Sequence, residues 1–84
     1  MTNDTTRPEP ADLQALVARV FELDLTEVSA ETPFAEDLGV DSLMLLDLAA
    51  HIEKRYGIKV GDVEISQVNS LDEVQRLLAI KTTA

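Results

Sequence analysis

The side chains that could do chemistry gather around one serine. Ser42 follows Asp41 directly, and the two residues begin a predicted helix after a long acidic segment. A serine hydroxyl becomes a nucleophile when a base activates it, and the one histidine of the chain, His51, is the available base. If both lie on one helix, their separation along the axis is ~13 Å, far beyond hydrogen-bond reach. We therefore expect no hydrolase site and predict that His51 is an exposed polar residue.

Thiol and metal chemistry find equally little support. The chain has no cysteine, which excludes disulfides, thiolate metal sites and a thiol nucleophile. One histidine excludes multi-histidine metal sites. The acids around the serine do not follow the spacing of a calcium-binding EF-hand loop; they are Glu36, Asp37, Asp41 and Asp47. We expect neither catalytic residues nor a metal site.

Ser42 occupies a position where helices attract anions. The first backbone N–H groups of a helix lack internal partners, and the helix dipole favours negative charge there. A phosphate ester on Ser42 would therefore meet a ready-made anion site. Position alone also allows a simpler interpretation, in which the serine only supports the helix cap.

A helix on each side of a long loop is predicted to position this serine. Pro10 suits a first helical turn, and apolar residues recur after it at helical spacing, which predicts a helix over about 10–23. The stretch LDLTEVSAETPFAEDLGV lacks sustained periodicity and predicts a loop of ~17 residues, much longer than the usual connection. Three apolar side chains are expected to anchor this loop in the core: Val28, Phe34 and Leu38. Long ordered loops often carry function.

The second half of the chain predicts further helices and no strands. Asp41 caps the serine helix and Gly57 ends it, while a short helical turn starts near Gly61. The S-x-x-E pattern at Ser70 predicts a last helix over about 71–80. The fold class is therefore all-α: a small four-helix bundle, with three main helices, one short helix and a long loop between helices one and two. Residues 10–80 form the domain, between tails at 1–9 and 81–84.

The serine helix has apolar residues on two faces. One face is predicted to point into the core: Leu45, Leu48, Ala49, Ile52 and Tyr56. The roughly opposite face carries Leu43, Leu46, Asp47, Ala50 and Lys54, with Met44 on a flank. Two interpretations follow: the helix is central and buried all round, or the second face docks other proteins. We favour docking, because methionine adapts to several partners.

The charge is strongly acidic and unevenly distributed. Seven Lys and Arg stand against 16 Asp and Glu, giving a net charge of −9, which disfavours nucleic acid and anionic membranes as partners. Between Glu22 and Asp41 there are seven acids and no Lys or Arg. Such a run is either a solvated loop or a negative collar around Ser42. With no apolar leader or membrane-length segment, the chain is expected to be cytoplasmic.

The residues around the serine resemble the attachment motif of acyl carrier proteins. The matching run is Asp37-Leu38-Gly39-Val40-Asp41-Ser42-Leu43, followed by Met44-Leu45-Leu46-Asp47-Leu48. In that family the serine after Gly-x-Asp carries 4′-phosphopantetheine through a phosphodiester. The predicted order of helices also matches that of the family, over about residues 10–80. This resemblance makes covalent modification the favoured interpretation of Ser42.

The resemblance implies roles for several residues. Ser42 would carry 4′-phosphopantetheine, whose thiol supplies the sulfur that a cysteine-free chain lacks. Asp41 would cap the helix and help a phosphopantetheinyl transferase recognise the site, and Gly39 would allow close approach at the loop end. The partner-binding residues would be Leu43, Met44, Leu46, Asp47 and Ala50. The expected partners are that transferase, an acyl-loading enzyme (an acyltransferase or an adenylating ligase) and a ketosynthase or other acyl-processing enzyme. The carrier itself is expected to be a monomer.

Departures from the family pattern narrow the choice of biosynthetic pathway. Carriers of primary fatty-acid synthesis usually place acids soon after the serine, whereas this chain has Met44, Leu45 and Leu46 there. Peptidyl carriers typically have Gly-Gly-x-Ser, whereas this chain has Gly39-Val40-Asp41-Ser42. We therefore expect a discrete carrier of specialised, polyketide-type or hybrid biosynthesis. A fatty-acid carrier, a discrete aminoacyl or peptidyl carrier and, more distantly, an unmodified helical adaptor are the alternatives.

Overall fold

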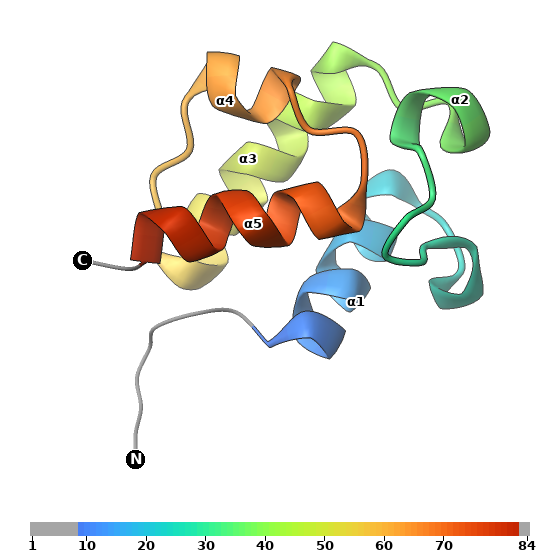
Figure 1. Cartoon of the computed structure of the whole chain (residues 1–84), viewed down its shortest axis with the longest axis horizontal. Coiled ribbons are helices and arrows are strands. Elements are labelled where there is room, and N and C mark those ends of the chain that lie inside the picture. Colours follow the sequence, from blue (N-terminus) through green and yellow to red (C-terminus); the bar gives the residue numbers. More distant parts are fainter. Residues whose placement is uncertain (1–8, 83–84) are drawn as a thin grey trace.

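The protein is a helical bundle built around the serine-bearing helix (Figure 1). The computed structural model describes residues 9–82. Within them the elements are α1 (Pro10–Phe21), the 3-10 helix η1 (Leu25–Glu27), α2 (Phe34–Leu38), α3 (Ser42–Tyr56), α4 (Asp62–Ser66) and α5 (Leu71–Thr82). None of these residues forms a strand, so the predicted all-α class with three long helices is confirmed.

Local capping fixes both ends of α3. The Asp41 carboxylate accepts a hydrogen bond from the Met44 N–H at 3.0 Å, which satisfies one of the unpaired donors of the first turn. Gly57 ends the helix with a φ of 70°, a left-handed conformation that costs glycine little. Both boundaries agree with the sequence prediction because both depend on neighbouring residues alone.

The core lies between α1, α3, α4 and α5. The helix α1 packs against α3 and α5, and α4 packs against α3. The predicted core face of α3 is confirmed: Leu45, Leu48, Ala49 and Ile52 are buried, and Tyr56 packs partly buried against them. From the loop, Val28 and Phe34 are fully enclosed and Leu38 lies against the core. The Phe34 ring meets Phe21 of α1 edge to face at 5.3 Å.

The segment predicted as an irregular loop contains two short helical elements, η1 and α2. Contacts from distant residues stabilise them. The Gln14 side-chain amide donates to the Val28 carbonyl at 2.6 Å and to the Leu25 carbonyl at 3.3 Å, which holds η1 against α1. Such contacts link residues 11 and 14 positions apart and leave no periodic signal in the segment itself. Residues 9–82 therefore contain five α-helices, one more short helix than the sequence predicted.

Asn69 ties α2 to the start of α5 through both its backbone and its side chain. Its carbonyl accepts from the Phe34 N–H at 2.7 Å, and its Oδ1 accepts from the Ala35 N–H at 3.0 Å. Its side-chain amide donates to Glu36 at 3.2 Å. Its own N–H donates to Glu73 at 2.7 Å. Asn69 thus accepts hydrogen bonds from backbone N–H groups in the first turn of α2 and joins that helix to the segment before α5.

Helix boundaries at the two ends of the domain differ slightly from the prediction. The helix α1 ends at Phe21 rather than near 23, because Glu22 adopts a left-handed conformation and Leu23 donates back to the Ala18 carbonyl at 2.8 Å. The helix α5 continues to Thr82, whose hydroxyl donates to the Leu78 carbonyl at 2.9 Å. Most of the predicted tails, residues 1–8 and 83–84, lie outside the described residues.

An ion pair fastens the far end of α3 to α1. The Arg55 guanidinium donates two hydrogen bonds to the Asp12 carboxylate, one of them at 2.9 Å, and the Tyr56 hydroxyl donates a third. The hydrogen bond from Arg55, and then the one from Tyr56, lower the pKa of Asp12. Burial first, and then the bond to Asp12, raise the pKa of Tyr56 to about 12. The end of α3 remote from Ser42 is therefore held against α1.

Candidate functional site

Ser42 is the first residue of α3 and is exposed. In the described part of the chain its hydroxyl makes no hydrogen bond, so the oxygen is available for modification. The chain reaches it from α2 through Gly39, Val40 and Asp41. Of these, Val40 is buried and donates its N–H to the Phe34 carbonyl at 3.0 Å. The short connection is thus fixed by the core immediately before the serine.

The first turn of α3 is arranged to receive an anion. Asp41 takes the Met44 N–H, and the Leu45 N–H donates to the Asp41 carbonyl at 3.1 Å. The N–H groups of Ser42 and Leu43 are left without a partner among the described residues. Open N–H groups at a helix start favour phosphate oxygens. Ser42 therefore fits a phosphodiester on its own hydroxyl.

Gly39 serves the site through its backbone conformation. It ends α2 with a φ of 66°, which side-chain-bearing residues rarely adopt. A Cβ placed there would meet no atom within 4 Å, so crowding by the chain itself does not require a glycine. The glycine turns the chain from α2 into α3. The space around it is also compatible with the close approach that the sequence predicts.

The second apolar face of α3 is exposed, which excludes a helix buried all round. Leu43 is 75% exposed and Leu46 38%, whereas Leu48 on the core face is fully buried. Asp47 and Ala50 are exposed on the same side, and Met44 is partly buried against the core. These five residues line one shallow groove: Leu43, Met44, Leu46, Asp47 and Ala50. We call this groove the α3 groove.

His51 does not meet Ser42. It is exposed, as the sequence predicts, and its Nε2 lies 3.7 Å from Asp47 one turn earlier, an ion pair when the imidazole is protonated. No base contacts the Ser42 hydroxyl in the described chain, and the described acids and His51 form no cluster suited to a metal ion. The described surroundings of Ser42 thus consist of an exposed hydroxyl with no base in contact and an exposed apolar groove beside it.

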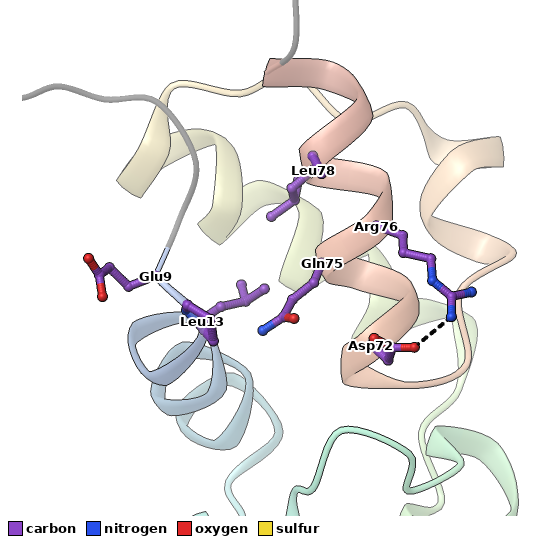
Figure 2. Close-up of a pocket in the computed structure, with 8 residues that line it drawn as sticks. Glu9, Leu13, Asp72, Gln75, Arg76 and Leu78 are labelled. Atoms are coloured by element: carbon purple, nitrogen blue, oxygen red, sulfur yellow. Dashed lines mark hydrogen bonds and ion pairs between the residues drawn. The ribbon is translucent and has the colours of Figure 1, made fainter.

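A separate cavity lies between the start of α1 and the side of α5 (Figure 2). Its volume is about 490 Å³, and Leu13 and Leu78 lie at its apolar side. The rim carries Glu9, Gln75 and an ion pair in which Arg76 meets Asp72 at 2.9 Å. None of the groove residues around Ser42 lines this cavity. The site at Ser42 is thus a surface site and not a pocket.

Sequence reasoning missed Asn69 as a positioning residue. By holding Phe34, Ala35 and Glu36 it fixes α2, and α2 leads through Gly39 into Ser42. Its one signal in the sequence is its place directly before the S-x-x-E pattern. In the structure Ser70 accepts the Glu73 N–H at 3.2 Å, but Glu73 reaches back to Asn69 instead of Ser70.

Comparison with known proteins shows to which family this chain belongs. The model of the family described as the phosphopantetheine attachment site matches residues 11–78, nearly the whole described domain. The chain therefore belongs to the family of phosphopantetheine-bearing carrier domains. None of the described helices is long and apolar enough to cross a membrane.

Individual relatives narrow the family to acyl carriers. The chain is 40% identical over 77 residues to polyketide-8 synthase acyl carrier protein 2 of Streptomyces avermitilis, covering 92% of this chain and 88% of the relative. The solved structure of 3-oxo-butyl acyl carrier protein, from the actinorhodin polyketide synthase of Streptomyces coelicolor, is similar with a TM-score of 0.77 at 28% identity. The holo form of the actinorhodin carrier gives the same TM-score and identity. Both structures cover 94% of this chain and are themselves covered to 95%.

The protein is an acyl carrier with 4′-phosphopantetheine as its prosthetic group. It carries intermediates for biosynthetic enzymes and does not catalyse their reactions. When bound, the group supplies a thiol on which an acyl chain is held as a thioester. The described chain has an exposed serine at the start of α3 and an exposed, mostly apolar groove beside it.

Proposed function

We propose that Ser42 is the attachment residue and that the carrier serves a polyketide-type pathway. The observation that carries the first part is the exposed Ser42 hydroxyl at the start of α3, beside two open N–H groups. Asp41 supports it by capping Met44, and Gly39 supports it by turning the chain into the helix. The carrier domain would span residues 10–80, in line with the family match over 11–78.

The α3 groove supports the pathway assignment. The groove residues that follow Ser42 are mostly apolar. A carrier that binds its partners through acidic residues alone would have Asp or Glu at these positions. The relatives named for polyketide synthases agree with this interpretation. The carried group would then be a polyketide-type acyl chain. A fatty-acid carrier and an aminoacyl or peptidyl carrier are the alternatives for the pathway, while the match to the phosphopantetheine attachment family speaks against the unmodified adaptor.

The partners follow from the role. A phosphopantetheinyl transferase would modify Ser42, an acyltransferase or adenylating ligase would load the thiol, and a ketosynthase or another acyl-processing enzyme would unload it. Each would dock on Leu43, Met44, Leu46, Asp47 and Ala50. The net charge of −9 opposes self-association, which favours a monomer. The proposed location is the cytoplasm.

Intact-mass measurement tests the attachment site. After co-expression with a broad-specificity phosphopantetheinyl transferase, we expect one phosphopantetheine on the wild type and none on Ser42→Ala, with unchanged helical circular dichroism. Ser66→Ala is the matched control, since Ser66 is another exposed serine on a helix, and it should be modified like the wild type. A modified Ser42→Ala variant, or an unmodified wild type, would overturn the assignment.

Loading then tests the pathway. The modified chain should accept a malonyl-type group from a polyketide acyltransferase faster than an amino acid from an adenylating enzyme of a peptide pathway. The mass of the acyl group on the chain purified from its native cells decides among the remaining alternatives. An aminoacyl group there would show that the carrier belongs to a peptide pathway.

A further inference from the structure

The exposed face of α3 continues past the α3 groove to a lysine. Leu43, Asp47, Ala50 and Lys54 follow one another at spacings of four, three and four residues, which places them along one side of the helix. Lys54 is exposed and lies in the last turn of α3. Its distance from Ser42 along the axis is ~18 Å. The stripe therefore begins at the attachment serine and ends at a cation.

Lys54 has no partner within the described chain. No acid stands three or four residues away from it: these positions are Ala50 and His51 within α3, and Gly57 and Ile58 directly after it. The adjacent acid, Glu53, accepts the Val60 N–H at 3.0 Å instead. Lys54 itself takes part in no ion pair or hydrogen bond with another described residue. A free cation on this face is notable in a chain with 16 acids.

Three other cations of the chain are paired within the molecule. Arg55, the next residue, points to α1 and pairs with Asp12, while Arg76 pairs with Asp72 and Lys81 with Glu64. These pairs stabilise the fold. Two neighbouring cations of α3 thus have separate surroundings, one bound within the molecule and one left open beside the α3 groove.

We propose that Lys54 is a specificity determinant: it selects partner enzymes that present a carboxylate about 18 Å from the mouth of their active site, at the far end of the α3 groove. The inference rests on the proposed function, because the partner is one that acts on the group carried by Ser42. The stripe then has two charges of opposite sign, with Asp47 and Lys54 separated by ~10 Å.

Complementarity defines the chemistry of this partner. Near Ser42 the exposed acids Asp37 and Asp41 favour a partner with cations around its entrance. In the middle, Leu46 and Ala50 require an apolar contact. At the far end Lys54 requires an anion. A uniformly basic surface satisfies the first requirement and is repelled by the last, so the partner orients along α3 in one direction only.

Lys54 also has a favourable place for the helix itself. A cation in the last turn of a helix interacts favourably with the helix dipole. This role predicts a small loss of stability in Lys54 variants and no effect on transfer. The experiment must therefore measure stability and transfer together.

The test uses a discrete ketosynthase that the loaded wild-type carrier acylates. Lys54→Glu should lower kcat/KM for acyl transfer about five- to tenfold at low salt, mainly by raising KM, and Lys54→Gln about two- to fourfold. The matched control is Lys59→Glu, which makes the same charge change at another exposed, unpaired lysine beyond the end of α3. It should change kcat/KM less than twofold. The effect of Lys54→Glu should shrink at high salt.

Two further readouts separate the possible outcomes. Modification of Ser42 by the transferase is measured first on every variant, so a failure of the proposed function appears as an unmodified wild type before any ketosynthase is added. A Glu→Lys or Asp→Lys change on the ketosynthase that restores transfer by Lys54→Glu would identify the facing carboxylate. Equal effects of Lys54→Glu and Lys59→Glu, or faster transfer by Lys54→Glu, would overturn the proposal.

Discussion

The two faces of α3 use the same kinds of side chain for opposite purposes. On the core face, Leu48 is fully enclosed by the surrounding helices, whereas Leu46, two residues earlier, is 38% exposed and Leu43 is 75% exposed. Burial on the first face stabilises the fold, and exposure on the second leaves apolar area for a partner to cover. A leucine pattern alone therefore does not separate folding from recognition; the orientation of the helix does.

The largest expected difference between the two faces is in stability. Leu48→Ala should lower the free energy of unfolding by about 3 kcal/mol, because it leaves a cavity in a packed core. Leu46→Ala should cost less than about 1 kcal/mol, because its side chain is already in contact with water. Urea unfolding monitored by circular dichroism measures both.

A small domain can lose its fold altogether with Leu48→Ala, so Ile52→Val provides a milder test on the same face. It should cost about 1 kcal/mol, still more than an exposed substitution of equal size. If Leu46→Ala proved as costly as Leu48→Ala, the exposed face would be part of the core and the comparison would fail.

A smaller and opposite difference is expected in partner binding. Leu43→Ala should weaken docking of a ketosynthase by about 1–2 kcal/mol, since an apolar side chain at the centre of an interface contributes more than an exposed charge. Asp47→Asn should cost about 0–1 kcal/mol. Met44→Asp should also exceed Asp47→Asn, but part of its effect comes through stability because Met44 packs against the core. Surface plasmon resonance on the modified carriers gives the ranking.

A larger loss for Asp47→Asn than for Leu43→Ala would reverse this ranking. Electrostatic attraction would then be the main determinant, and the exposed leucines would have to be explained in another way. Leu48→Ala, where it remains folded, should bind the partner normally and serves as the control from the other face.

The smallest effect is expected at the end of α3, where Arg55 and Tyr56 bind Asp12. Since the folded pKa of Asp12 lies below its ordinary value of 3.8, its contribution is complete above that value and is lost as the pH falls through the folded pKa. Asp12→Asn should therefore lower Tm slightly near neutral pH and make little difference at the acid extreme. The Asp12 and Arg55 side chains are 37% and 45% exposed, so solvent screening keeps this contribution to stability small.

Tyr56 has the opposite effect on the pH dependence of stability, and this effect is expected at alkaline pH. Its pKa is raised from 10.0 to about 12, so the stability linked to the neutral hydroxyl is full below 10.0 and is lost as the pH rises through about 12. Tyr56→Phe should flatten this alkaline loss. Thermal unfolding across the pH range measures both residues, and equal Tm differences at neutral and acid pH for Asp12→Asn would contradict the linkage.

The sequence predicted those parts of the fold that depend on neighbouring residues. Asp41 and Gly57 fix the ends of α3 locally, and apolar spacing assigns its residues to two faces, but only the packing of the helix shows that the second face is exposed. The Asp41 cap beside Ser42 likewise depends on neighbouring residues alone. The short helices η1 and α2 could not be predicted, because Gln14 and Asn69 form them from distant positions in the chain. The open surroundings of Lys54 likewise depend on where Glu53 and Arg55 direct their side chains.

The four hydrogen bonds of Asn69 have a consequence for how the molecule opens. The Phe34 and Ala35 amides lie 35 and 34 positions from their acceptor, yet they are released when that one residue moves. The Asp72 N–H donates to the Ala30 carbonyl at 2.9 Å and ties the same two segments a second time. The loop and the start of α5 should therefore open and close as a single cooperative unit, and amide hydrogen exchange in both would proceed at a common rate. The acidic residues before Ser42 are then presented in one fixed arrangement for as long as that unit stays closed.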